Sequence, residues 1–258
     1  VIDALLDFDQ ASGRTKTDSA DRLIAFVREK GLEVEWVIDT HVHADHLTAT
    51  PYVREQLGGQ TGIGEHIATV QKVFGEIFNE GQAFHTDGSQ FDHLFKDGET
   101  YRLGSIEAKA IHTPGHTPAC MSHVIGDAVF VGDTIFMPDF GTARCDFPGG
   151  DAGTLYDSIQ KLFALPDETR IFLCHDYKAP GRDDYVWETT IGEEKHSNKH
   201  VKQGTSREDF VKMRTERDAT LSMPKLILPS VQINMRAGEM PPAEPNGKIY
   251  MKLPINAL

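Results

Sequence analysis

Hydrophobic and polar positions along this chain follow two periods, which together predict a mixed α/β fold. Apolar residues recur every three or four positions over 19–30, 48–57, 66–79 and 153–164, a spacing that predicts amphipathic helices. Shorter apolar or alternating runs bounded by turn residues predict strands. These runs are 33–39, 60–64, 91–95, 99–103, 106–112, 121–125, 128–131 and 170–174, and residues 1–3 resemble the end of a further strand.

Capping residues refine the ends of the predicted helices. Thr17 or Asp18 is expected to cap the first helix, and Gly31 to end it. Two more polar helices are predicted near 188–200 and 206–220, the second opening with a capping box at residues 205–208. The segment from Met223 on is rich in proline and predicts an extended tail.

The order of these elements favours two sheets packed face to face with helices outside, an αββα sandwich of the α/β class. The strand-rich middle disfavours a doubly wound sheet, and no Gly-rich phosphate loop follows a strand. We therefore expect a single domain over 1–258, with a helical insertion at 178–222 and an extended C-terminal tail at 223–258.

Composition limits which classes of binding partner and which cellular compartment are expected for this chain. A net charge of −13 argues against nucleic acid or an anionic membrane as the main partner, and no apolar run is long enough to span a bilayer. We expect no secretory leader, although the start at Val1 leaves room for residues upstream. The widely spaced Cys120, Cys145 and Cys174 predict no disulfide framework. For Cys120 and Cys174, which lie close in sequence to His116 and His175, buried thiols are favoured over ligands or redox-sensitive groups. Together these features predict a cytoplasmic protein.

The densest chemistry lies in Thr40–His46, where three histidines and an aspartate directly follow an apolar run. Imidazole binds Zn, Cu, Fe and Ni, and a carboxylate adds an oxygen ligand. A polar loop with surface histidines is the plainer interpretation. Three later segments favour the metal, because each places one ligand after an apolar run. The resulting candidates are His41, His43, Asp45, His46, His116, Asp133 and His175, enough for two metals or for one metal with supporting residues.

The pattern His-x-His-x-Asp-His, a later single histidine, a Gly-Asp pair and a final histidine resembles the metallo-β-lactamase superfamily. The likeness runs from Val34 to His175 and implies the αββα fold. It also implies that a hydrolase of this superfamily would carry two zincs that share the aspartate and activate a water. The motif itself leaves non-hydrolytic members open.

Finer segments resemble the persulfide dioxygenase family, within a longer bacterial branch. They are Thr40–Thr48, Thr113–Pro118, Arg144–Phe147, His175–Tyr177 and Asn234–Arg236. The resemblance implies oxygen-dependent oxidation of glutathione persulfide to glutathione and sulfite at one non-haem Fe(II), as in hydrogen sulfide detoxification. His41, His116 and Asp133 would be the iron ligands, leaving open positions as oxygen chemistry requires. His43, Asp45, His46 and His175 would then orient ligands, handle protons or hold a second metal.

Substrate contacts are expected from Arg144, Tyr177 and Arg236. The two guanidinium groups suit glutathione carboxylates, whereas the phenol suits a group near the metal. Alternatively each is a surface arginine in an ion pair, or a buried tyrosine with one partner. Seven other histidines are expected on the surface or in the core, and among them His112 is the candidate for a supporting role beside the ligands. A homo-oligomer and a sulfurtransferase partner are both left open.

The main rival function is a dinuclear zinc thioester hydrolase of the glyoxalase II kind, which shares the glutathione moiety. A lactonase or β-lactamase is disfavoured because arginines flank the predicted site. A metal-storing or thiol-sensing module is disfavoured because open coordination positions serve no purpose in storage. Insertions at 65–95 and 178–222 depart from shorter family members and leave the shape of the pocket open.

Overall fold

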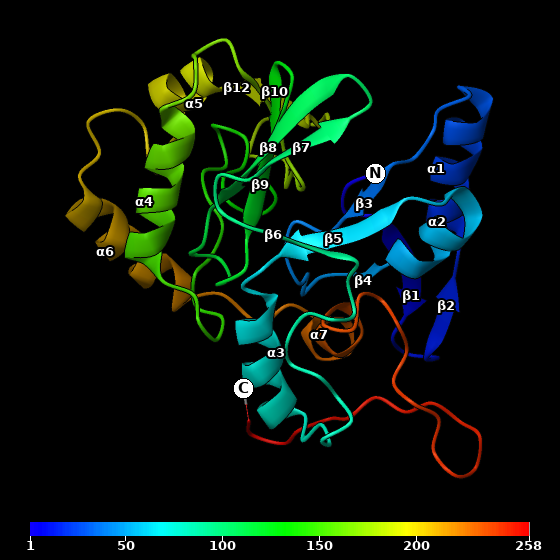
Figure 1. The fold of residues 1–258 in the computed structure, drawn as a ribbon. Helices are drawn as coiled ribbons and strands as arrows, with labels where there is room; N and C mark the ends of the chain where they lie inside the picture. Colours follow the sequence, from blue (N-terminus) through cyan, green and yellow to red (C-terminus); the bar gives the residue numbers. More distant parts are fainter. Residues whose placement is uncertain (258) are drawn as a thin grey trace. The chain divides into compact units, whose positions relative to one another are not determined.

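A computed structural model describes residues 1–257, which divide into two compact units (Figure 1). The first unit contains Val1–Leu94 and the segment from Ser222 onward, and the second contains Phe95–Leu221. Each unit combines β-sheets with α-helices, so the mixed α/β content expected from the hydrophobic pattern is present in both.

The first unit contains two small sheets. One has the strand order β2-β1-β4, in which β1 runs antiparallel to both neighbours, with Asp7 opposite Lys16 and Leu5 opposite Thr48. The other has the order β3-β5-β6, and β3 and β5 run parallel with Val37 opposite Thr61. The strands are β1 (Leu5–Asp9), β2 (Arg14–Lys16), β3 (Trp36–Ile38), β4 (Leu47–Thr48), β5 (Gln60–Gly64) and β6 (His93–Phe95).

Four helices complete the first unit: α1 (Asp18–Glu29), α2 (Thr50–Leu57), α3 (Ile67–Ile77) and α7 (Ile227–Asn234). The first two pack against each other and against the strands, so that Ala20, Val37 and Val53 share one apolar core. The α7 helix contacts β4, the short strand that follows the histidine-rich segment (Figure 1). Because of this packing, the C-terminal part of the chain reaches the metal-binding motif.

The second unit is built on one six-stranded sheet with the order β12-β11-β10-β9-β8-β7. All neighbouring pairs are antiparallel except β10 and β11, which run parallel with Val129 opposite Ile171. The strands are β7 (Thr100–Leu103), β8 (Ile106–His112), β9 (Met121–Ile125), β10 (Ala128–Phe130), β11 (Arg170–Phe172) and β12 (Glu188–Thr190).

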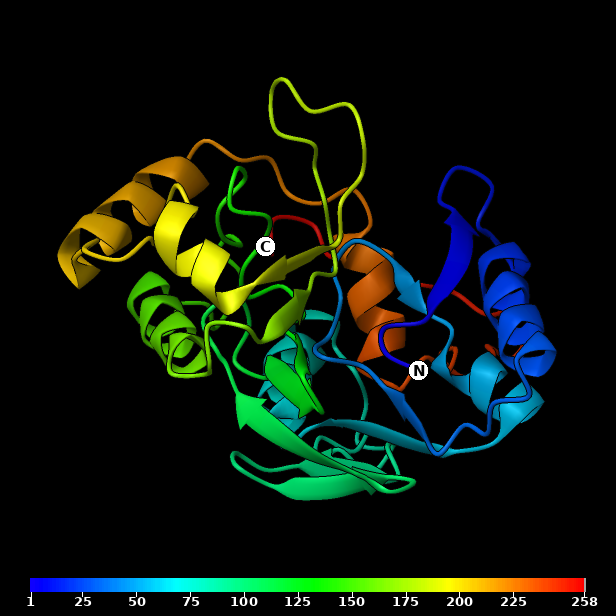
Figure 2. The ribbon, with the colours of Figure 1, turned by 90° about the horizontal axis from the view of Figure 1, so that it is seen from above.

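Three helices flank this sheet: α4 (Ala152–Phe163), α5 (Ile191–Ser197) and α6 (Arg207–Asp218). In both views α4 and α6 lie side by side (Figures 1 and 2). The Leu155, Ile159 and Leu162 face of α4 is fully buried with Phe210 of α6, as the helical period predicts. This core fixes the loops that follow the strands of the second unit.

Two expectations for the C-terminal third of the chain are wrong. Residues 188–190 form strand β12 rather than the start of a helix, because they pair with Arg170–Phe172 of β11. The segment from Met223 is not uniformly extended, because Ile227–Asn234 forms the α7 helix. Pro229 lies in its first turn, where a missing N–H costs no intrahelical hydrogen bond.

Two helix caps in the structure differ from the predicted ones, either in the capping residue or in the hydrogen bond that it makes. The N-cap of α6 is Ser206, whose hydroxyl accepts a hydrogen bond from the Asp209 amide, so the capping box predicted one position earlier is wrong. At α1 the Thr17 hydroxyl donates to Asp21 instead of capping the backbone. None of the described helices is long and apolar enough to cross a membrane.

Candidate metal centre

In the first unit, the histidine-rich segment is the connection between β3 and β4. The imidazole rings pack in sequence, with centroids 4.0 Å apart for His41 and His43 and 4.3 Å apart for His43 and His46. Ligand atoms of His43, Asp45 and His46 lie within 4.8 Å of one another. His41 and His43 are buried, His46 is half-buried and Asp45 is exposed, so this unit presents a compact cluster of nitrogen donors and one accessible carboxylate.

A short hydrogen-bond chain sets the tautomer of His41. The Thr40 hydroxyl donates to the Asp3 carboxylate at 2.9 Å and lies 2.9 Å from Nδ1 of His41. Because the hydroxyl proton is used on Asp3, Thr40 must accept from Nδ1–H. The lone pair of His41 is therefore on Nε2, as a metal ligand requires.

Asp3 also engages His43, whose Nε2 lies 2.9 Å from a carboxylate oxygen. Burial alone would lower the pKa of His43, but the charge and hydrogen bond of Asp3 raise it to about 9. The reverse holds at Asp3, where burial is outweighed by His43 and the pKa falls well below its usual range. Asp39 accepts hydrogen bonds from Thr48 and Thr50, and burial raises its pKa to about 6.

Asn234, at the end of α7, holds the histidine-rich segment in place. Its side-chain NH₂ donates to the backbone carbonyls of His43 at 2.9 Å and His46 at 2.8 Å, and its carbonyl oxygen accepts from the Thr48 amide at 2.8 Å. The segment has no regular secondary structure of its own to satisfy these backbone groups, so the buried amide of Asn234 supplies their partners.

In the second unit, two further predicted residues, His116 and His175, converge on the Asp133 carboxylate. Nε2 of His116 lies 3.7 Å from one carboxylate oxygen, and Nε2 of His175 lies 3.5 Å from the other. The Arg144 backbone carbonyl accepts from Nδ1 of His116 at 2.8 Å, which places the lone pair of His116 on Nε2. Two imidazole nitrogens therefore flank one carboxylate, a donor set that suits a transition metal.

The loop that carries His116 is fixed by close contacts with α4. Gly115 has φ +136°, and a Cβ at this position would lie 2.4 Å from Cα of Leu155. Ser158 donates to the Pro114 carbonyl at 2.6 Å. His112 donates through Nε2 to the Pro118 carbonyl at 2.9 Å, so its relation to the site is through the shape of this loop.

Arg144 and Tyr177 lie on the second unit near its ligand set. The Arg144 guanidinium makes two 2.6 Å hydrogen bonds to Asp146 and lies over the Phe147 ring, which contacts His116. Tyr177 is about half exposed, at 52%, and its ring lies 5.6 Å from that of His175.

Arg236 lies in the first unit, where it binds Glu80 at 2.6 Å and stacks on the Phe84 ring. The structure thus supports the predicted ion pair for Arg236 more directly than a substrate contact. Of the two cysteines expected to be buried, Cys120 is buried and Cys174 is only half-buried. Cys145 is buried as well, and burial raises the pKa of its thiol.

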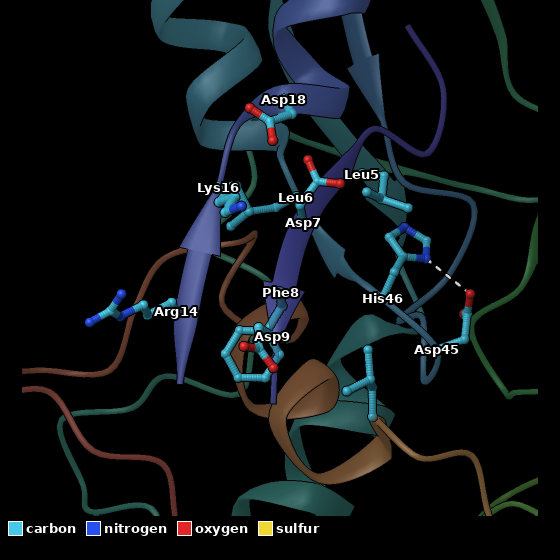
Figure 3. Close-up of a pocket in the computed structure, with 11 residues that line it drawn as sticks. Leu5, Leu6, Asp7, Phe8, Asp9, Arg14, Lys16, Asp18, Asp45 and His46 are labelled. Atoms are coloured by element: carbon cyan, nitrogen blue, oxygen red, sulfur yellow. Dashed lines mark hydrogen bonds and ion pairs between the residues drawn. The ribbon is translucent and has the colours of Figure 1, made fainter. Parts of the chain in front are cut away.

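A cavity of about 420 Å³ lies in the first unit beside Asp45 and His46 (Figure 3). The β1–β2 hairpin lines it with side chains of both charges, including Asp7 and Lys16, and Leu226 adds an apolar wall. Figure 3 shows His46 turned toward Asp45, 3.2 Å away, on the opposite side of β1 from Arg14.

Sequence reasoning missed Asp3 as part of the site, and it gave Asn234 no role there although the Asn234–Arg236 segment carries part of the family resemblance. Asp3 was visible only as the end of a strand, and its role depends on a contact with His43, 40 positions further along the chain. Asn234 lies in a segment predicted to be extended. A detectable signal was the run of apolar residues around Pro229, which is compatible with a first helical turn.

The ligand clusters are candidate metal sites on a fold of mixed sheets and helices. Comparison with known families shows to which class of protein this chain belongs. The chain belongs to the metallo-β-lactamase superfamily, whose family model matches residues 1–175. A crystal structure of ETHE1 from Myxococcus xanthus has a TM-score of 0.69 and 33% sequence identity, covering 91% of this chain and 93% of that one. The predicted fold class is confirmed.

Individual relatives point to more than one activity. A probable metallo-hydrolase of Burkholderia pseudomallei is 54% identical over 100% of this chain and 91% of its own length. Glyoxylase B2 of Dictyostelium discoideum is 51% identical over 100% and 89%. The human mitochondrial persulfide dioxygenase ETHE1 is 31% identical over 87% and 78%. The chain is thus a member of a metal-dependent enzyme superfamily, and its relatives include a probable metallo-hydrolase, a glyoxylase and a persulfide dioxygenase.

Proposed function

We propose that this chain is a persulfide dioxygenase that oxidises glutathione persulfide. In the balanced reaction, one glutathione persulfide, one O₂ and one water give one glutathione, one sulfite and two protons. The terminal sulfur is oxidised by four electrons, O₂ accepts them, and the S–S bond breaks. The observation that carries the proposal is the likeness to ETHE1 proteins, in sequence over 87% of the chain and in fold over 91%.

His41, His116 and Asp133 are the proposed ligands of one Fe(II). The hydrogen bonds that fix Nδ1 of both histidines leave Nε2 as the donor nitrogen, which fits the assignment. Such a two-histidine, one-carboxylate set supplies redox chemistry with positions open for sulfur and oxygen.

The surrounding side chains would orient the ligands and the substrate. His43 directs Nε2 toward Asp3, so that nitrogen acts as a partner of the carboxylate rather than as a ligand. His175 would hold the second oxygen of Asp133. Arg144 would bind a glutathione carboxylate by sharing its guanidinium with Asp146, and Tyr177 would donate to the substrate beside His175. Arg236 remains a weaker prediction, since Glu80 occupies its guanidinium.

A dinuclear zinc hydrolase acting on glutathione thioesters is the second candidate. Nε2 of His46 is buried and has no hydrogen-bond partner among the described residues, and Asp45 lies beside it. A second metal ion would satisfy this nitrogen. The similarity to glyoxylase B2 and to a probable metallo-hydrolase also favours this candidate.

Oxygen uptake separates the two candidates. Purified protein should consume O₂ and release sulfite when glutathione persulfide is added, and should not hydrolyse an S-hydroxyacylglutathione. His116→Ala should abolish both turnover and iron binding, whereas His196→Ala, at an exposed histidine of α5, should change neither. Thioester hydrolysis without O₂ consumption would replace the dioxygenase assignment with the hydrolase. The compartment, the oligomeric state and a sulfurtransferase that supplies persulfide remain predictions.

A further inference from the structure

A long loop follows His175 in the second unit and returns to the sheet at β12. Residues 173–187 have no helix or strand, yet the two ends are held together, since the Leu173 amide donates to the Trp187 carbonyl at 3.0 Å. The loop projects beyond the strands as the yellow-green segment at the top of Figure 2. It carries three exposed aromatic residues, Tyr177, Tyr185 and Trp187.

The Asp176 carboxylate accepts hydrogen bonds from several residues of its own loop. Its side chain is only 4% exposed although the loop is on the surface. The carboxylate accepts from the Val186 amide at 2.7 Å, from the Lys178 amide at 3.1 Å and from both terminal nitrogens of Arg182. These bonds, with that of Arg182 foremost, hold the pKa of Asp176 well below its usual range. One carboxylate therefore joins the beginning, the tip and the end of the loop.

Arg182 extends this link to a neighbouring turn. Its Nε donates to Asp139 at 2.8 Å and its Nη2 donates to the other oxygen of Asp139 at 3.1 Å. Asp139 lies in a tight turn, in which the Phe140 amide donates to the Met137 carbonyl at 2.7 Å. A planar guanidinium is suited to such paired bonds with two carboxylates, and a lysine at this position lacks the geometry.

The two segments joined by Arg182 enclose an aromatic cluster around the candidate site. The Tyr177 ring stacks on Phe140 at 4.7 Å and meets Phe136 edge-on at 5.4 Å. His175 lies 5.6 Å from Tyr177 and 6.2 Å from Phe136. The turn that holds Asp139 thus supplies the aromatic rings against which Tyr177 rests.

We propose that Arg182 is a positioning residue that sets substrate affinity by holding Tyr177 beside His175 through its joint pairing with Asp176 and Asp139. The role of Tyr177 as a substrate contact rests on the proposed function, whereas the order of the loop does not. Arg182 touches neither the substrate nor a metal ligand in this assignment. Its loss therefore affects the KM for the glutathione compound more than kcat or metal content.

The kinetic test is a double-mutant cycle between Arg182 and Tyr177. Arg182→Gln should raise the KM for glutathione persulfide about fivefold to tenfold, the size of one lost hydrogen bond, with kcat and iron content nearly unchanged. In a Tyr177→Phe background the same substitution should raise KM little further. Arg182→Lys should give an intermediate KM. A KM increase of equal size in both backgrounds would overturn the proposal.

Two further variants separate positioning from general destabilisation. Asp139→Asn weakens the link to the turn without touching Asp176 and should reproduce the KM increase. Arg170→Gln removes a comparable exposed ion pair, to Glu188 at 2.6 Å in the strands flanking the loop, and should leave KM unchanged. If Arg170→Gln and Arg182→Gln behave alike, Arg182 has no special role.

Limited proteolysis tests the loop without any turnover. Trypsin should cut after Lys178 in Arg182→Gln much faster than in the parent chain or in Arg170→Gln, because the loop is released. Equal cleavage rates would overturn the proposal even if the dioxygenase assignment holds. If the parent chain consumes no O₂ but Arg182→Gln still shows faster cleavage, the proposed function fails while the structural role of Arg182 stands.

Discussion

The side chain of Asn234 donates a 2.9 Å hydrogen bond to the backbone carbonyl of His43, although 191 positions separate the two residues. The same NH₂ group reaches the His46 carbonyl, and the amide oxygen accepts from Thr48. The metal-binding motif is therefore shaped by the C-terminal helix α7 as well as by its own sequence. Every bond involved lies within the first unit.

Replacing Asn234 should destabilise the chain and loosen the histidine-rich segment. Asn234→Ala leaves one buried N–H and two carbonyls without their present partner, which should lower the free energy of unfolding by about 3 kcal/mol. Asn234→Asp keeps an acceptor for the Thr48 amide but loses both donors, so it should bind metal less tightly. Denaturant titration and metal analysis check these outcomes. Asn246→Ala, at an exposed asparagine that donates to Tyr250, is the control and should have little effect.

Gly115 should tolerate no side chain. A Cβ there would overlap the α4 backbone at Leu155, and the residue precedes His116. Gly126 also has a positive φ, +62°, but a Cβ added there would meet nothing within 4 Å, so this position isolates the backbone cost. Gly126→Ala should cost about 1–2 kcal/mol of stability. Gly115→Ala should cost about 1–3 kcal/mol more and lower the metal content. Similar losses in both variants would show that the overlap is relieved.

The parts of this molecule that follow a local pattern could be predicted from sequence. The Leu155, Ile159 and Leu162 face of α4 and the alternating positions around Ala108 and Ala110 in β8 are examples, since burial follows their period. The candidate ligands could be predicted because several occupy adjacent positions. In the structure the His43 and His46 ring centroids lie 4.3 Å apart, and His116 Nε2 lies 3.7 Å from the Asp133 carboxylate.

Features that depend on distant contacts could not be predicted in this way. The β1–β2 hairpin lacks a continuous apolar run, and its strands are stabilised by pairing with each other and with β4. The α7 helix was predicted to be extended because the segment from Met223 is rich in proline. The roles of its buried polar residues depend on the segments they contact. Asp3 likewise gains its role from His43 and Thr40.

Glu194 should make the stability of the chain depend on pH. It is buried in α5, where one carboxylate oxygen accepts from Asn198 and the other has no partner among the described residues. Burial raises its pKa from 4.5 to about 8. Between these values the folded chain holds a proton that the unfolded chain releases, so the free energy of unfolding falls as pH rises.

Glu194→Gln removes the titrating group and keeps an acceptor for Asn198. The variant should therefore lose less stability than the parent chain between pH 5 and pH 8, a window set by the two pKa values. Thermal unfolding followed across this range checks the difference in slope. Glu193→Gln, at an exposed neighbour on the same helix, should retain the slope of the parent chain. Parallel curves for Glu194→Gln and the parent would show that Glu194 is ionised in the folded state.

Arg144 should contribute to substrate affinity, because in the proposed function its guanidinium binds a glutathione carboxylate while it also pairs with Asp146. Arg144→Ala should raise the KM for glutathione persulfide roughly tenfold to a hundredfold, as expected for loss of a charged hydrogen bond. Because the Arg144 backbone carbonyl, not its side chain, binds His116, iron content should be unchanged. Asp146→Asn releases the guanidinium and is expected to lower KM or leave it unchanged. An unaltered KM in Arg144→Ala would make the pair with Asp146 purely structural.

Metal stoichiometry gives the most direct test of the site as a whole. We expect one iron and little zinc per chain in anaerobically prepared protein, although side chains for a second metal are present. A neighbouring zinc about 3.5–4 Å away would hold a bridging hydroxide where sulfur or O₂ should bind. Asp133→Ala should remove the iron, whereas His46→Ala should retain it, since His46 lies outside the proposed triad. Two zincs per chain, one of them lost in His46→Ala, would contradict the single-iron assignment and favour the hydrolase.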